Sequence, residues 1–150
     1  MFKRTCIKWT LSAMFCIAAG APALAAETPA SLSGVKVVGA EEVKKLLDAG
    51  VPVIDTRVAA EYAEKTIKGA KSVPYKEKSA KEPGFDPAQD QFDLAKLPGD
   101  KSAPLVFFCN SGECWKSYKA SAVAVKAGYT KINWFRGGFP EWSSKGLPTQ

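Results

Sequence analysis

The chain has 150 residues and a formal net charge of +6, from 21 lysines and arginines against 15 acidic residues. The lysines are scattered and form no basic stripe with interleaved aromatic residues, so we predict no nucleic-acid partner. The sequence contains no histidine, which excludes Ser-His-Asp and Cys-His catalysis and any imidazole metal ligand. Because two thiolates without histidine make a poor zinc site, we expect neither a metal nor a cofactor.

The first 25 residues have the pattern of a secretory signal peptide. Basic residues without acidic ones precede residue 9, an apolar run spans residues 9–20, and small residues surround Ala25. The apolar run is shorter than the roughly 20 residues that a membrane-spanning helix needs. We therefore predict cleavage near Ala25 or Ala26, a periplasmic or secreted protein, and no stable membrane insertion after cleavage.

The remaining chain is long enough for one domain with a core and too short for two. Residues 26–34 are small and polar and are predicted to form a flexible lead-in, with the domain itself at 35–148. Signal removal leaves only two cysteines, Cys109 and Cys114. An exported protein meets an oxidising compartment, in which two nearby thiols can pair.

Apolar runs and helical spacing alternate along the domain. Residues 76–87 form a loop rich in Lys, Glu, Pro and Gly, and a helical turn is expected near Leu94. The alternation indicates βαβ units. The predicted fold class is α/β, a single domain with a mainly parallel central sheet and helices on both faces. Strands are predicted at 35–38, 51–55, 71–75, 105–108 and 132–135, and helices at 40–49, 58–65, about 117–127 and 139–145.

The stretch 104–127 carries the chemistry. An apolar strand ends at Cys109, and a short polar loop follows before the helical spacing begins. Backbone N–H groups in such a loop and at such a helix start favour an anion. A cysteine held there is a better thiolate than a free one, and hence a nucleophile. The alternative is a buried, inert thiol. The loop residues are Asn110, Ser111, Gly112, Glu113, Cys114, Trp115 and Lys116.

Three roles are open for Cys114. It could resolve a persulfide or sulfenate on Cys109, form a disulfide with it, or pack as a small side chain. A disulfide requires Cα atoms roughly 4.4–6.8 Å apart, a condition that a short loop does not guarantee.

Other residues near the loop have two interpretations each. Trp115 is interpreted as packing over the loop or at the core edge in preference to stacking on a substrate. Asp55 and Arg57, after the second strand, are interpreted as a structural pair bracing the loop in preference to catalytic groups. Lys116 either steers an anionic substrate or is a solvated lysine at a helix start.

Five pieces in one order resemble the rhodanese-like family: VIDTR, IKGAKSVPY, VFFCNSGECWKSYKASAVAVKAGY, INWFRGGFPEW and GLP. The resemblance covers residues 35–148 and implies that Cys109 accepts a sulfane sulfur as a persulfide, cradled by loop N–H groups from about Asn110 to Trp115. It also implies a small sulfur donor or a thiol acceptor as partner, with a periplasmic protein as a further candidate.

The loop, Cys-x4-Cys-Trp, departs from that family's pattern. An arginine is often found where this chain has Cys114, and a small hydroxyl residue where it has Trp115. The charge of Glu113 works against a thiolate, and we expect Lys116 and Lys119 to offset it in part. The related cysteine phosphatases need an arginine at the position of Trp115 to clamp phosphate, so phosphatase activity is excluded.

The sequence therefore predicts an exported rhodanese-like sulfurtransferase or sulfane-sulfur carrier using Cys109. A periplasmic dithiol–disulfide redox protein using Cys109 and Cys114, and a non-catalytic binding module with this fold, are the alternatives.

Overall fold

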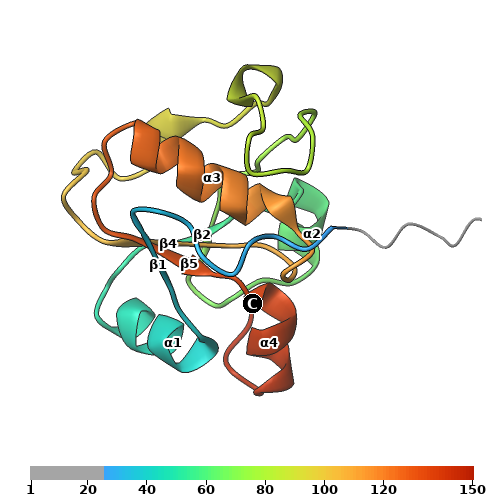
Figure 1. Cartoon of the computed structure of the whole chain (residues 1–150). Coiled ribbons are helices and arrows are strands. Elements are labelled where there is room, and N and C mark those ends of the chain that lie inside the picture. Colours follow the sequence, from blue (N-terminus) through green and yellow to red (C-terminus); the bar gives the residue numbers. More distant parts are fainter. Residues whose placement is uncertain (1–25) are drawn as a thin grey trace, which may run out of the picture.

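The computed structural model describes residues 26–150, with one parallel sheet at the centre (Figure 1). The predicted signal peptide, residues 1–25, lies outside the described residues. Within them, five strands pair in the order β1-β5-β4-β2-β3, and each pairing is parallel. The strands are β1 (Val35–Val37), β2 (Val53–Asp55), β3 (Lys71–Ser72), β4 (Leu105–Phe108) and β5 (Ile132–Phe135).

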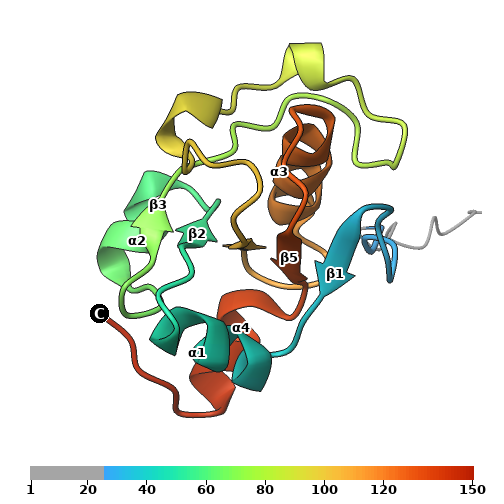
Figure 2. The same cartoon turned by 90° about the vertical axis from the view of Figure 1, so that its left-hand side faces the viewer.

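Helices cover both faces of this sheet. Helix α3 (Trp115–Lys126) lies on one face, and α1 (Ala40–Asp48) and α4 (Gly138–Ser144) lie on the other (Figures 1 and 2). Helix α2 (Ala59–Glu64) lies near β3 (Figure 2). Strands β2, β4 and β5 are buried along their whole length, as expected for a covered parallel sheet. The predicted α/β fold is confirmed.

The alternation of side chains along β4 decides where Cys109 lies. Val106 and Phe108 belong to the core between the sheet and helices α1 and α4. Leu105 and Phe107 belong to the core beneath α3. Because successive side chains of a strand point to opposite faces, the residue after Phe108 faces α3. The strand thus delivers the Cys109 side chain to the start of that helix.

The excursion 76–97 between β3 and β4 is mostly irregular and lies beside α3 (Figures 1 and 2). Its 3₁₀ turns are η1 (Pro87–Gln89) and η2 (Leu94–Lys96). Asp86 and Asp93 begin these turns, and each carboxylate accepts a backbone N–H two residues later. Within residues 26–150, none of the helices is both long enough and apolar enough to cross a membrane.

Helix α3 begins at Trp115, two residues before the predicted start. Cys114 precedes it in an extended conformation, with φ of −89° and ψ of 109°. Strand β3 is shorter than predicted and ends at Ser72, although the N–H groups of Val73 and Tyr75 still donate to the carbonyls of Asp55 and Thr56, each at 3.0 Å.

Candidate active site

Cys109 is 1% exposed and directly follows β4. The Thr56 hydroxyl and N–H both donate to the Phe108 carbonyl, at 2.9 and 3.0 Å, and fix the strand end. The Phe139 N–H donates to the Cys109 carbonyl at 2.8 Å. Gly138 has a φ of +62°, and a Cβ there would clash with the carbonyl oxygens of Cys109 and Asn110. Glycine is therefore required where the α4 turn meets the loop.

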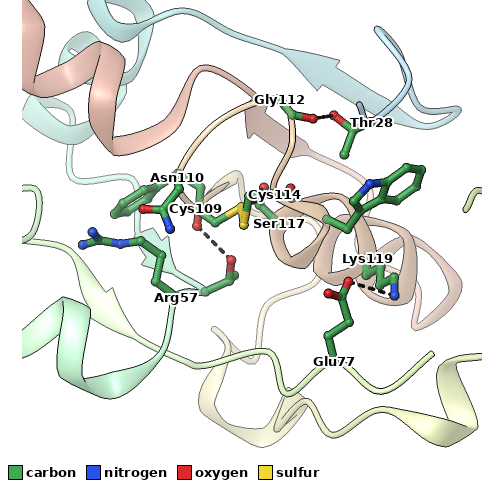
Figure 3. Close-up of a disulfide and its surroundings, with 12 residues drawn as sticks. Thr28, Arg57, Glu77, Cys109, Asn110, Gly112, Cys114, Ser117 and Lys119 are labelled. Carbon is green, nitrogen blue, oxygen red and sulfur yellow. Dashed lines mark hydrogen bonds and ion pairs between the residues drawn. A yellow bond between two sulfur atoms is a disulfide. The ribbon is translucent and has the colours of Figure 1, made fainter. Parts of the chain in front are cut away.

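Cys109 and Cys114 form a disulfide across the loop (Figure 3). Their Cα atoms are 6.3 Å apart, which lies within the range that a disulfide can bridge. Cys114 is partly exposed whereas Cys109 is buried. Cys114 is therefore the more accessible residue of the pair.

The loop amides suit an anion. The Cys114 N–H donates to the Ser111 carbonyl at 2.9 Å and closes the turn. In the described part of the chain, the N–H groups of Ser111, Gly112 and Glu113 have no hydrogen-bond acceptor. Free N–H groups beside the start of a helix stabilise negative charge on a bound group.

Ser117 contacts the sulfur of Cys109 and was not among the predicted site residues. Its Oγ lies 3.0 Å from Cys109 Sγ, and Trp134 Nε1 donates to that Oγ at 2.9 Å. The sequence signal for Ser117 was its helical spacing from Ala120 and Ala124, which places a serine on the face that packs against the sheet.

Residues 26–28, which we call the N-terminal strap, pack on the loop. The Thr28 N–H and hydroxyl donate to the Gly112 carbonyl at 2.7 and 2.6 Å, and Trp115 Nε1 donates to the Ala26 carbonyl at 2.8 Å. Arg136 Nη2 donates to the Thr28 carbonyl at 2.8 Å. The predicted lead-in is thus a bound segment at this point, since it satisfies a loop carbonyl and an indole N–H that would otherwise lack partners.

Asp55 and Arg57 form a buried ion pair at 2.8 Å, the arrangement expected of a structural pair. The Asp55 carboxylate also accepts from the Arg57 N–H at 2.9 Å and the Thr66 hydroxyl at 2.8 Å. Asn110 Nδ2 donates to the carboxylate of Glu61, on α2, at 2.9 Å. These contacts fix the end of β2 and attach α2 to the loop.

Trp115 is buried in a hydrophobic cluster with Tyr118 and Trp134, and its ring packs edge-on against Tyr118. Glu113 is exposed, and Lys116 borders a surface hollow lined also by Val58. The expectation that Lys119 offsets Glu113 is wrong. Lys119 is fully buried, and its Nζ lies 2.9 Å from a carboxylate oxygen of Glu77, turned away from the loop (Figure 3).

In the part of the chain that the structure describes, no three Cys, Asp or Glu side chains converge as candidate metal ligands. The chemistry available to these residues is that of sulfur: a buried thiol, a second thiol within bonding reach, and backbone donors for an anion.

The sequence pattern of the family described as "Rhodanese-like domain" matches residues 39–145. The chain belongs to the rhodanese-like family. A chloroplastic protein of Arabidopsis thaliana named thiosulfate sulfurtransferase 16 is 30% identical over 105 residues, covering 70% of this chain and 84% of that protein. A sulfurtransferase of Allochromatium vinosum is 30% identical over 98 residues, covering 65% of this chain and 77% of that one.

Solved structures agree with this rhodanese-like fold. The human single-domain sulfurtransferase TSTD1 has a TM-score of 0.53 and 26% identity, covering 73% of this chain and 96% of that one. The polysulfide-sulfur transferase homodimer from Wolinella succinogenes has a TM-score of 0.56 and 22% identity, covering 78% of this chain and 79% of that one.

Proposed function

We propose that this rhodanese-like protein is an exported sulfurtransferase or sulfane-sulfur carrier that holds sulfur as a persulfide on Cys109. The observation that carries the proposal is the position of Cys109, at the end of β4, beside the start of α3 and inside a loop with free N–H groups. The names of the relatives, which include a thiosulfate sulfurtransferase and a polysulfide-sulfur transferase, support this class of reaction.

Sulfur uptake requires the reduced protein. The Cys109 thiolate attacks the outer sulfur of thiosulfate, the S–S bond of the donor breaks, and sulfite leaves with the electron pair. A polysulfide donates in the same way and leaves shorter by one sulfur. The N–H groups of Ser111, Gly112 and Glu113 stabilise the terminal persulfide anion.

Cys114 provides a route for release. Its thiolate attacks the Cys109 sulfur of the persulfide, the Cys109–Cys114 disulfide forms, and the terminal sulfur leaves as hydrosulfide. A small dithiol then reduces the disulfide and is itself oxidised. The Cα separation of 6.3 Å supports this step, because it lies within the range that a disulfide bridges. Alternatively, a thiol acceptor takes the terminal sulfur directly.

Export is the second part of the proposal, and it rests on the signal-peptide pattern of residues 1–25. An oxidising compartment would hold the resting protein as the disulfide. Intact mass of protein recovered from the periplasm, before and after thiol alkylation, measures both cleavage near Ala25 or Ala26 and the state of the two thiols. An uncleaved protein in the cytoplasm would contradict export.

Sulfur transfer is tested by incubating the reduced mature protein, with Cys114→Ser so that the persulfide is not resolved, with thiosulfate or a polysulfide and measuring its intact mass. We expect one added sulfur atom, mapped to Cys109 by peptide analysis. Absence of added sulfur with every donor would contradict the proposal.

The disulfide favours a second candidate, a dithiol–disulfide redox protein that uses the same cysteines. In that case the protein transfers electrons and not sulfur. A redox titration should then give a reversible two-electron couple, while sulfur donors leave no persulfide at any time.

A further inference from the structure

Ser117 lies on the first turn of α3, is buried, and contacts the sulfur of Cys109. Its hydroxyl has one hydrogen and can also accept. The indole N–H of Trp134 can only donate, and it points to Ser117 Oγ at 2.9 Å. The hydroxyl therefore accepts from Trp134 and keeps its own hydrogen for Cys109 Sγ, at 3.0 Å.

The second polar neighbour of this sulfur, the Cys114 carbonyl, disfavours the thiolate. The Cys114 carbonyl oxygen lies 3.2 Å from Cys109 Sγ. A carbonyl at that distance accepts from a protonated thiol and repels a thiolate. Within residues 26–150, Ser117 is thus the side-chain donor in contact with Cys109 Sγ.

Most charged side chains around the site are paired with groups other than Cys109. Arg57, from the β2 end, is paired with Asp55. Glu61 of α2 accepts from Asn110, and Lys119 of α3 is paired with Glu77 of the excursion. Arg136, whose guanidinium packs beside Gly112, donates to the Thr28 carbonyl and lies 3.4 Å from Glu27. Of the remaining charges near the loop, Glu113 is exposed and Lys116 is partly exposed. Within residues 26–150, none of these charged side chains hydrogen-bonds to Cys109 Sγ, and the polar groups in contact with that sulfur are neutral.

We propose that Ser117 is a catalytic residue that stabilises the Cys109 thiolate, and that Trp134 positions it. This proposal deepens the proposed function and rests on Cys109 being the reactive thiol. When a small thiolate attacks the sulfur of the partly exposed Cys114, a mixed disulfide forms there, the Cys109–Cys114 bond breaks, and Cys109 leaves as a thiolate. Ser117 donates to that leaving group. The same hydrogen bond prepares the thiolate that attacks a sulfur donor.

The test uses a Cys114→Ser background, in which Cys109 is the single thiol of the mature chain. The rate of Cys109 alkylation by iodoacetamide is measured against pH. Ser117→Ala should move the midpoint of this profile upward by about one pH unit, since a hydrogen bond to a charged group is lost. Ser117→Thr, which keeps the hydroxyl, should restore the midpoint.

Ser121→Ala is the matched control. Ser121 lies one turn further along α3, is equally buried, and donates to the Ser117 carbonyl at 2.8 Å without contacting the sulfur. Its removal should leave the midpoint unchanged. Equal midpoints for Ser117→Ala and Ser121→Ala would overturn the proposal.

Trp134→Phe gives a second readout, because it frees the hydroxyl without removing it. We expect a midpoint between those of the parent and Ser117→Ala. Failure of the two proposals can be told apart: a parent protein that takes up no sulfur contradicts the proposed function alone, whereas normal uptake with an unmoved midpoint in Ser117→Ala contradicts the role of Ser117 alone.

Discussion

Two irregular segments pack against helix α3, and they are held in different ways. The sulfur loop, residues 109–114, is held mainly by neutral hydrogen bonds, such as those from Thr28 to the Gly112 carbonyl and from Phe139 to the Cys109 carbonyl. One further bond joins Asn110 to the Glu61 carboxylate. It contains the free N–H groups and the disulfide.

The excursion 76–97 is held by buried charge instead. The ammonium of Lys119 lies 2.9 Å from Glu77, and the Asp90 carboxylate accepts from the N–H and hydroxyl of Ser79 and from the hydroxyl of Tyr75. Burial of Asp90 would raise its pKa, but these bonds outweigh burial and lower the pKa to about 2. Burial and the bond to Asp90 raise the pKa of Tyr75, which stays protonated.

The difference shows how the fold separates stability from reactivity. The ion pair of Lys119 and Glu77 holds the excursion against a side of α3 that faces away from the sulfurs (Figure 3). The sulfur loop has mostly neutral contacts and a single hydrogen bond to a carboxylate, that of Glu61, so we expect its conformation and its thiols to respond to redox chemistry. We expect the excursion to be sensitive to pH and the loop to be sensitive to reductants.

The largest expected effect concerns the two cysteines. Cys109→Ser should lower sulfur transfer by about 10³-fold or more, because the nucleophile is lost. Cys114→Ser should still take up sulfur but release hydrosulfide to a dithiol more slowly, by about 10-fold, because the acceptor must reach the buried persulfide directly. Sulfide release under single-turnover conditions is the measurement. Equal losses in the two variants would mean that the cysteines do not have separate roles.

Removal of the buried cation should have the largest effect on stability. Lys119→Met removes the buried ammonium that lies 2.9 Å from Glu77 and 4.0 Å from Asp90, at a cost of about 3–5 kcal/mol in the free energy of unfolding. Urea denaturation measures the loss, and Lys116→Met, on the same helix but partly exposed, is the control. The alkylation profile of Cys109 in the folded variant should not change. A shifted profile would show that the two segments are electrostatically coupled.

A smaller effect depends on pH. The pKa of Asp90 is lowered on folding, so its ionised form stabilises the protein above its ordinary pKa of 3.8. Relative to Asp90→Asn, the natural chain should be more stable by about 1 kcal/mol at neutral pH. This advantage should disappear as the pH falls from 3.8 to about 2. Urea denaturation at several pH values measures it, and a difference that is independent of pH would argue against an ionised Asp90.

The smallest effect concerns the strap. Thr28→Val removes the hydroxyl that donates to Gly112 at 2.6 Å and accepts from Arg136 Nε at 3.2 Å. The loss of about 1 kcal/mol of local stability should speed reduction of the disulfide by dithiothreitol about five-fold. Thr130→Val, at an exposed hydroxyl far from the loop in the sequence, should leave the reduction rate unchanged. Equal rates for both variants would show that the strap does not restrain the loop.

The sequence predicted the elements that local patterns determine. The bounds predicted for β4 and β5 agree with the structure, because short apolar runs end there at polar or glycine-containing segments. The start of α3 was predicted two residues too late, because Cys114 precedes the helix without the side-chain cap that marks a helix start in a sequence. Cys109 could be located from its place after a buried strand.

Other features depend on contacts between distant residues, which no local pattern encodes. Thr28 and Gly112 are 84 positions apart. Ser117 Oγ accepts a hydrogen bond from the indole of Trp134, on β5, and this contact leaves the hydroxyl hydrogen for the Cys109 sulfur. The direction of Lys119 depends on where the excursion places Glu77.

The most direct test of the account follows one turnover of the reduced protein by rapid quench and mass spectrometry. The protein is mixed with one equivalent of polysulfide, and species are trapped by acid and alkylation. We predict that a persulfide on Cys109 forms first and then decays into the Cys109–Cys114 disulfide as hydrosulfide is released. A persulfide on Cys114, or a disulfide that forms with no preceding persulfide, would contradict the account.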